Sequence, residues 1–390
     1  MQTIKGIHYK TGQPIAVEVH NGIIKSIDVL DIETRYLPVI APGMIDMQVN
    51  GYYGIDFNKD TLTVDDVVTI TKLQLAQGVT TYFPTVITNS VECIKQSLNI
   101  IAQACNEFEL VNSCIGGIHL EGPFISPLDG PVGAHNKRYV RAPDWDLFQQ
   151  FNETAQHRIK IITLSPEWPQ AIEFTRQCVK SNIIVSIGHT AASSQQIAAV
   201  VDAGATLSTH LGNGTHQTLP RHPNYIWDQL ADDRLATGFI GDGFHLPLSV
   251  IKVILKVKAD KAILVSDSVS LAGMPFGNYN EPVGGDVVLT ADGKLHLAGK
   301  PDTLAGSAQT QLQALQKLYH QGLCSMAQAW DLASVNAAGF LKYGTINGLQ
   351  VGAQANLALY YNNHKTLDIA TTYKNGVQVY PEKLINTYTS

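Results

Sequence analysis

The sequence predicts an α/β fold, in which a (β/α)8 TIM-like barrel stands beside a small β-sandwich built from both termini. In the middle of the 390-residue chain, about eight short apolar runs alternate with stretches of helical periodicity, which is typical of a closed parallel barrel. At both ends, apolar and polar residues alternate around Asn-Gly pairs, which favours β-hairpins. We therefore expect residues 42–347 to form the barrel and residues 1–41 and 348–390 to form one β-sandwich domain.

The terminal strands are predicted from two hairpin patterns. Residues 16–19 and 23–27 alternate on either side of Asn21-Gly22, and residues 371–380 repeat the pattern around Asn375-Gly376. Asn and Gly adopt the left-handed backbone of a two-residue hairpin turn at little cost, so both pairs predict tight turns.

The barrel elements follow in order along the chain. Apolar runs predict strands that begin near Met44, Val79, Cys114, Ile159, Ile183, Ala205, Ala236 and Ala262. Helical periodicity fills several gaps between them, over residues 63–77, 90–108, 166–180 and 193–203. The first of these helices begins with Thr63 and Asp66 at the spacing of a capping box. Residues 283–299 interrupt the alternation, and Asp292-Gly293 at their centre predicts a β-hairpin inserted after the last barrel strand.

The composition excludes several classes of protein. A formal net charge of −6 without any run of basic residues argues against nucleic-acid binding. No segment has the apolar length of a signal peptide or a transmembrane helix, so no membrane partner is expected. Five cysteines, an odd number without CxxC spacing, argue against a disulfide framework and fit a reducing compartment. We expect a cytoplasmic protein.

Four polar residues each end one of the predicted barrel strands: Glu121, His189, His210 and Asp267. Any one of these residues alone is more often a hydrogen-bonded or capping residue than a functional one. Their joint place at strand ends, where barrel enzymes carry their active sites, favours function. One carboxylate and two imidazoles suit Zn²⁺ or Fe²⁺ and leave a position open for water. Asp267 would then be the general base that accepts a proton from that water.

The motifs around these residues resemble the N-acetylglucosamine-6-phosphate deacetylases of the amidohydrolase superfamily. The match is ordered, covers nearly the whole chain, and consists of Ala41-Pro-Gly-Met-Ile-Asp46, His119-Leu-Glu-Gly-Pro-Phe124, Gly188-His-Thr190, Thr209-His-Leu-Gly-Asn213, Asp242-Gly-Phe-His245, Ser266-Asp267 and Leu304-Ala-Gly-Ser307.

The resemblance implies hydrolysis of the acetamide of a 2-acetamido sugar phosphate to the free amine and acetate. It also implies the barrel and β-sandwich, with Glu121, His189 and His210 as metal ligands and Asp267 as general base. The resemblance also assigns four substrate contacts. His135 would lie near the scissile carbonyl, and Asn213 and His245 would bind the sugar phosphate. Arg221 would reach into the site of a neighbouring subunit and bind the phosphate there, which implies a homodimer.

Two of the substrate positions also have a physical rationale. Asn213-Gly214 follows the His210 strand end, and backbone N–H groups there are placed to bind an anion. The guanidinium fork of Arg221 matches phosphate oxygens, although a solvated loop residue is the alternative interpretation.

The residues after the first strand bear on the metal count. Many amidohydrolases carry His-x-His there and bind a second metal, whereas this chain has Gln48 and Asn50. Because amides are weak ligands for Zn²⁺, we expect one divalent metal per chain, Zn²⁺ first and Fe²⁺ as the alternative.

The loop of residues 212–223 departs from the family pattern. It lacks the family's aromatic residue and following Asn-Ala-Met, and it contains two additional histidines, His216 and His222. These changes do not affect the predicted metal ligands, but they leave the identity of the substrate open. The alternatives are a galacto-configured sugar, an unphosphorylated sugar or another N-acyl compound. A catalytically inactive binding barrel is the alternative from a different class of protein.

Overall fold

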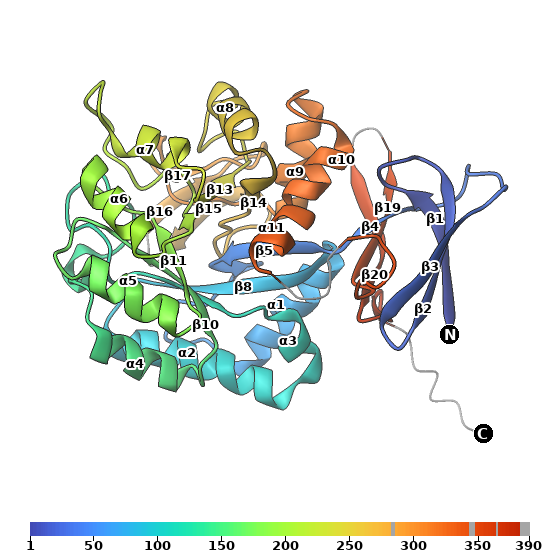
Figure 1. The fold of residues 1–390 in the computed structure, drawn as a ribbon, viewed down its shortest axis with the longest axis horizontal. Helices are drawn as coiled ribbons and strands as arrows, with labels where there is room; N and C mark the ends of the chain where they lie inside the picture. Colours follow the sequence, from blue (N-terminus) through green and yellow to red (C-terminus); the bar gives the residue numbers. More distant parts are fainter. Residues whose placement is uncertain (282–284, 343–347, 364–365, 383–390) are drawn as a thin grey trace.

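The computed structural model describes residues 1–281, 285–342, 348–363 and 366–382. A parallel barrel surrounded by helices makes up most of the molecule, and a separate sheet built from both ends of the chain lies beside it (Figure 1). A small antiparallel sheet is attached to the barrel. No helix in these described ranges has the length and apolar character needed to cross a membrane.

The barrel has the predicted eight strands, hydrogen-bonded to one another in chain order and all parallel. The strands are β5 (Met44–Val49), β8 (Val79–Ile87), β9 (Ile118–Glu121), β10 (Ile159–Leu164), β11 (Ile184–Ile187), β12 (Leu207–Ser208), β13 (Ala236–Ile240) and β14 (Ala262–Val265). The third strand begins at Ile118 instead of Cys114, because Cys114 is the last residue of helix α3 (Glu109–Cys114) and residues 115–117 connect that helix to the strand.

The barrel closes between its first and last strands at an irregular seam. Val49 forms an isolated parallel bridge with Ser268, beyond the end of β14. The N–H of Asp267 donates to the carbonyl of Gln48 at 3.0 Å, and the N–H of Asn50 donates to the carbonyl of Ser268 at 2.9 Å. The seam therefore places the residues that follow β5 directly beside those that follow β14.

Helices pack around the barrel (Figure 1). Besides α3 they are α1 (Val64–Ala76), α2 (Val91–Glu107), α4 (Trp145–Thr154), α5 (Ala171–Lys180), α6 (Ser194–Asp202), α7 (Tyr225–Ala231), α8 (Leu248–Lys258), α9 (Gln311–His320), α10 (Met326–Leu332) and α11 (Val335–Phe340). The predicted capping box of Thr63 and Asp66 is present at the start of α1. Helix α5 begins later than predicted, because residues 166–170, which include Pro166 and Pro169, form turns before the helix starts.

The strands from both termini form one continuous seven-stranded sheet. They are β1 (Gln2–His8), β2 (Pro14–His20), β3 (Ile23–Val29), β4 (Val39–Pro42), β19 (Leu357–Asn362), β20 (Leu367–Lys374) and β21 (Val377–Tyr380). The sheet folds back on itself, since the N–H of Ala355 donates to the carbonyl of Gly22 at 2.7 Å. Its two halves enclose an apolar cluster that includes Val17, Ile24 and Leu357. Both predicted Asn-Gly turns are present.

The predicted hairpin belongs to a larger, four-stranded antiparallel sheet: β15 (Gly277–Glu281), β16 (Gly285–Leu289), β17 (Leu295–Leu297) and β18 (Lys300–Leu304). Strands β16 and β17 are the hairpin itself, although its first predicted residues, 283–284, lie outside the described residues. The predicted domain limit at residue 347 and the last predicted sandwich residues, 383–390, also lie outside them, so the exact domain limits stay a prediction.

Candidate active site

The four strand-end residues lie together at the C-terminal end of the barrel. Glu121 is the last residue of β9, while His189, His210 and Asp267 each lie two residues beyond the ends of β11, β12 and β14. All three of the latter residues have positive φ angles, of 48°, 27° and 48°. Such left-handed backbone is uncommon for residues other than glycine and concentrates at functional sites, where the surrounding structure holds it.

Glu121, His189 and His210 form a buried group of the composition that binds divalent metals. Glu121 Oε1 lies 3.2 Å from His189 Nε2 and 2.9 Å from His210 Nε2, and the two imidazole nitrogens are 3.1 Å apart. Ligand atoms of a tetrahedral Zn²⁺ with bonds of about 2.0 Å are separated by about 3.3 Å. The three atoms therefore already have nearly the spacing that a single metal ion requires.

The tautomer of His189 also fits metal binding. Its Nδ1 lies 2.8 Å from the carbonyl oxygen of Pro131, so Nδ1–H donates and the Nε2 lone pair faces His210 and Glu121. Two glycines make room for this ring. A Cβ at Gly214 would lie 2.6 Å from His189 Nδ1, and a Cβ at Gly133 would lie 3.2 Å from its Cε1. Gly214, predicted as a substrate contact, thus lies against the ring of a predicted metal ligand.

The buried negative charge of Glu121 favours a cation between Glu121, His189 and His210. Burial alone would raise the pKa of Glu121, but its close contacts with the imidazoles of His189 and His210 hold that pKa well below its usual range. Burial opposes the charge on His210, yet its hydrogen bond to Glu121 outweighs this and raises the pKa of His210 to about 9. A proton on His210 thus neutralises the buried carboxylate, and a bound metal would take over that role.

Asp267 lies beside this group without belonging to it. Burial raises the pKa of its carboxyl to about 6, against the lowering effect of the nearby His210 charge. The side chain of Asn50, at the end of β5, donates a hydrogen bond to Asp267 Oδ1 at 2.7 Å. Asp267 is therefore a partly buried carboxyl group whose pKa suits proton transfer near neutral pH.

Two further predicted histidines reach the same region. His135 Nε2 lies 3.3 Å from His189 Nε2, and burial lowers the pKa of His135 to about 3, so the ring is neutral. His245 donates from Nδ1 to Asp242 Oδ2 at 2.6 Å, and the other oxygen of Asp242 accepts the backbone N–H groups of Phe244 and His245. Asp242 thereby fixes the turn that carries His245.

A cavity of about 560 Å³ unites these residues. It is lined by the three ligand candidates, Asp267, Asn50, His135, His245, Asn213 and Gly214. Arg221 is exposed on its loop and, within the described part of the chain, does not line this cavity. His216 instead contacts the hydroxyl of Tyr225, and His222 is exposed.

The chain was compared with known proteins. It is 33% identical over 330 residues, 82% of this chain and 80% of the relative, to the N-acetylglucosamine-6-phosphate deacetylase of Bacillus subtilis (strain 168). It is 28% identical over 349 residues, 87% of this chain and 89% of the relative, to an N-acetylgalactosamine-6-phosphate deacetylase of Escherichia coli O157:H7. This chain belongs to the N-acetylglucosamine-6-phosphate deacetylase family.

The solved structures agree with this assignment. The N-acetyl-D-glucosamine-6-phosphate deacetylase of Mycobacterium smegmatis superposes with a TM-score of 0.84 at 25% identity, over 97% of this chain and 100% of that one. No family model matched the chain. The family and fold make this chain a hydrolase of the amidohydrolase superfamily.

The sequence did not predict that the four-stranded sheet lines part of this cavity. Val287 and Leu295, from β16 and β17, and residues 302–306, at the end of β18 and just beyond it, line the cavity opposite the barrel. The Leu304-Ala-Gly-Ser307 motif indicated the family but not a place in the cavity. The position of an inserted sheet over the barrel mouth depends on tertiary packing, which local sequence patterns do not determine.

A buried hydrogen-bond chain close to the candidate metal ligands was not predicted either. His119 contacts the Met47 carbonyl through Nδ1 at 3.2 Å and Thr163 Oγ1 through Nε2 at 2.7 Å. Thr163 continues to Thr209 Oγ1 at 2.7 Å, and Thr209 to Ser186 Oγ at 2.6 Å. Each of these polar residues lies on a different barrel strand or strand end, so the chain links the strands that present Glu121 and His210.

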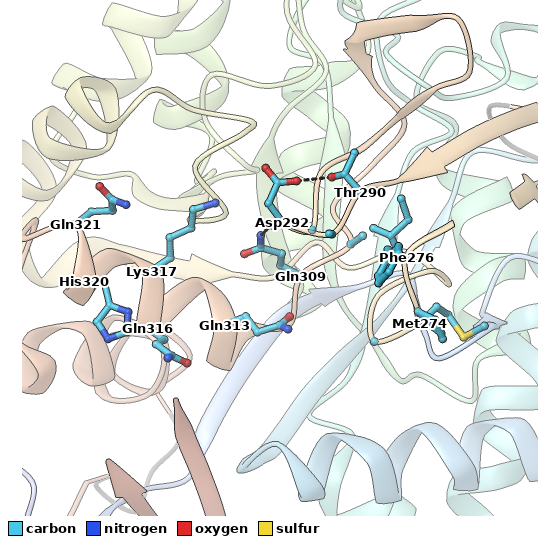
Figure 2. Close-up of a pocket in the computed structure, with 16 residues that line it drawn as sticks. Met274, Phe276, Thr290, Asp292, Gln309, Gln313, Gln316, Lys317, His320 and Gln321 are labelled. Carbon is cyan, nitrogen blue, oxygen red and sulfur yellow. Dashed lines mark hydrogen bonds between the residues drawn. The ribbon is translucent and has the colours of Figure 1, made fainter. Parts of the chain in front are cut away.

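A second cavity, of about 550 Å³, lies between the β16–β17 turn and α9 (Figure 2). Thr290 and Asp292 form a hydrogen bond on one side of it, and Lys317 extends from α9 on the other. The ammonium of Lys317 lies 3.8 Å from the ring centroid of Phe244, in the turn that carries His245. None of the predicted site residues lines this cavity in the described part of the chain.

Proposed function

We propose that this chain catalyses metal-dependent hydrolysis of the acetamide of N-acetylglucosamine-6-phosphate, giving the free amine and acetate. The relatives named above act on N-acetyl amino-sugar phosphates according to their names. The observation that carries the proposal is the convergence of Glu121, His189, His210 and Asp267 on one buried cavity at the barrel mouth.

One divalent metal, Zn²⁺ or Fe²⁺, is proposed as the cofactor, held by Glu121, His189 and His210. A metal held there would supply activation of a water molecule and polarisation of the amide carbonyl. The His189 tautomer and the near-tetrahedral spacing of the ligand atoms support this assignment.

Asp267 is proposed as the proton carrier. Its carboxylate takes a proton from the attacking water and delivers it to the nitrogen of the leaving amine. The neutral ring of His135 is placed to donate a hydrogen bond to the scissile carbonyl, whose oxygen gains charge during attack.

The sugar phosphate is proposed to bind Asn213, Gly214 and His245 of one chain and Arg221 of a second copy. A homodimer is supported by exposed apolar side chains on α7 and α8, the two helices that follow Arg221 along the chain: Trp227, Val250, Val253 and Val257. All five cysteines are free thiols, which supports a cytoplasmic location.

Acetate release from two substrates tests the proposal. N-acetylglucosamine-6-phosphate should be hydrolysed, and free N-acetylglucosamine should be a far weaker substrate because it lacks the phosphate. If the free sugar is hydrolysed equally well, the phosphate contacts are assigned wrongly. If neither sugar releases acetate, the proposed function itself fails.

N-acetylgalactosamine-6-phosphate is the second candidate substrate. A relative with that name covers 87% of this chain, and the loop of residues 212–223 departs from the family pattern. The ratio of kcat/KM for the two sugar phosphates decides between them.

A further inference from the structure

Asn50 lies at the seam where the barrel closes, and its backbone is held on both sides. Its N–H donates to the carbonyl of Ser268 at 2.9 Å, and its carbonyl accepts the N–H of Phe57 at 2.9 Å. Asp267 is tied to the same seam through its own N–H, which donates to the carbonyl of Gln48 at 3.0 Å. The backbones that carry Asn50 and Asp267 are therefore fixed relative to each other.

The side chains of Asn50 and Asp267 meet across this seam. Asn50 Nδ2 donates to Asp267 Oδ1 at 2.7 Å. The ionised carboxylate only accepts hydrogen bonds, so the amide must present its NH₂ group, since the opposite orientation would bring two oxygens together. A donor bonded to a carboxylate is a strong, directional restraint.

We propose that Asn50 is the positioning residue for the proton carrier Asp267, an inference that rests on the proposed function. The terminal torsion of an aspartate is soft, so a carboxylate at a strand end needs a second restraint to present one oxygen. By occupying Oδ1, Asn50 reserves Oδ2 for the attacking water and the leaving nitrogen. The hydrogen bond between Asn50 and Asp267 forms only because the barrel closes at this seam, and it determines which oxygen of Asp267 transfers the proton.

This role predicts a separation of kinetic effects. Misplacement of a reacting group by about 1 Å can cost about 100-fold in rate. Asn50→Ala and the nearly isosteric Asn50→Leu should each lower kcat by about 10- to 100-fold and leave KM within about threefold, because the restraint acts on proton transfer. Metal content per chain should remain that of the wild type, since Asn50 is not a proposed ligand.

Asn336 provides a matched control. Its Nδ2 donates at 2.8 Å to the carbonyl of Ala262, at the opposite end of the same strand β14. Asn336→Ala removes a comparable hydrogen bond to β14 far from the cavity, so it should lower the Tm and leave kcat unchanged. A purely structural role for Asn50 predicts instead that both asparagine variants behave alike.

The experiment compares wild type, Asn50→Ala, Asn50→Leu and Asn336→Ala for acetate release, bound metal and Tm. A selective fall of kcat in both Asn50 variants supports the inference, and if the alanine variant fails to fold, the leucine variant carries the test. Wild-type kcat in a folded Asn50 variant, or a loss that appears only in KM or metal content, overturns it. An inactive wild type refutes the proposed function, which is a different result.

Discussion

Left-handed backbone has different causes in two regions of this molecule, the terminal sheet and the barrel mouth. In the terminal sheet it lies at Asn21-Gly22 and Asn375-Gly376, whose φ angles lie between 49° and 76°. At the barrel mouth it lies at His189, His210 and Asp267. Asn and Gly adopt this conformation readily, whereas a histidine or an aspartate does so at a cost of about 1–3 kcal/mol that the surrounding structure must offset.

The difference separates residues that serve folding from residues that serve chemistry. The terminal turns reverse the chain with the residue types that local physics prefers. The barrel mouth holds its side chains in a conformation that local physics disfavours, so that they converge on one cavity. Substitutions at the mouth should therefore remove activity at little cost in stability, and substitutions in the terminal turns should do the reverse.

The largest effect is expected from Glu121→Gln. The amide is a weak metal ligand and removes the negative charge that His189 and His210 share, so bound metal should be lost and kcat/KM should fall by about 1000-fold or more. Metal analysis of the purified variant together with acetate release checks this. Retained metal with full activity would remove Glu121 from the ligand set.

Asp267→Asn should lower kcat by about 100- to 10,000-fold, because the amide cannot carry the proton. The Tm should stay the same or rise, since Asn tolerates left-handed backbone and the buried charge is gone. Metal content should be unchanged. Steady-state kinetics and thermal unfolding measure both quantities, and undiminished turnover would refute the assignment of Asp267.

Asp46 at the seam gives a pH dependence of stability. Burial raises the pKa of its carboxyl to about 7, although N–H groups of Gln48 and Ser266 donate to it. The folded state therefore holds a proton that the unfolded state releases near pH 4, so stability falls as pH rises from about 4 to about 7 and is level above that.

Asp46→Asn removes this titration. The Tm of the variant minus the Tm of the wild type should therefore increase as the pH rises from 5 to 8, because only the wild type loses stability over this range. The increase should correspond to about 2–4 kcal/mol in the free energy of unfolding. A Tm difference that is independent of pH would show that Asp46 is ionised in the folded protein throughout this range.

Gly22→Ala tests the terminal sheet. A Cβ at this position, with φ of 75°, would lie 2.8 Å from the backbone oxygen of Asn375. Gly12 has a similar φ of 69° with open space around it. Gly12→Ala should therefore cost about 1 kcal/mol for backbone strain alone, and Gly22→Ala more, with kcat/KM unchanged in both. Equal Tm values for the two variants would contradict the close approach of the two turns.

Local patterns accounted for much of the fold. The Asn-Gly turns, the Thr63 capping box and most strand starts follow from nearest-neighbour physics and were predicted correctly. The start of β9 was misplaced because the apolar residues before Ile118 suit a helix or a strand equally well. The four-stranded sheet was predicted only as a hairpin, because strands β15 and β18 are mostly polar and lack the apolar alternation of β16 and β17.

The sequence predicted which residues form the site, but not how they contact one another or which backbone conformation they adopt. Strand-end positions and family motifs led to Glu121, His189, His210 and Asp267, which the structure brings together. Asn50 was noticed only as a weak ligand, because its contact with Asp267 spans 217 residues and depends on closure of the barrel. Positive φ at the three strand ends could not be predicted from the sequence, since histidine and aspartate adopt it only where the surrounding structure holds it.

The most direct test of the central claim is a metal titration of the chelator-treated protein, followed by acetate release from N-acetylglucosamine-6-phosphate. If Glu121, His189 and His210 hold a single catalytic metal, activity should be absent without metal, rise linearly with added Zn²⁺ or Fe²⁺, and reach its plateau at one equivalent per chain. Full activity without metal, or a plateau at two equivalents, would contradict the account.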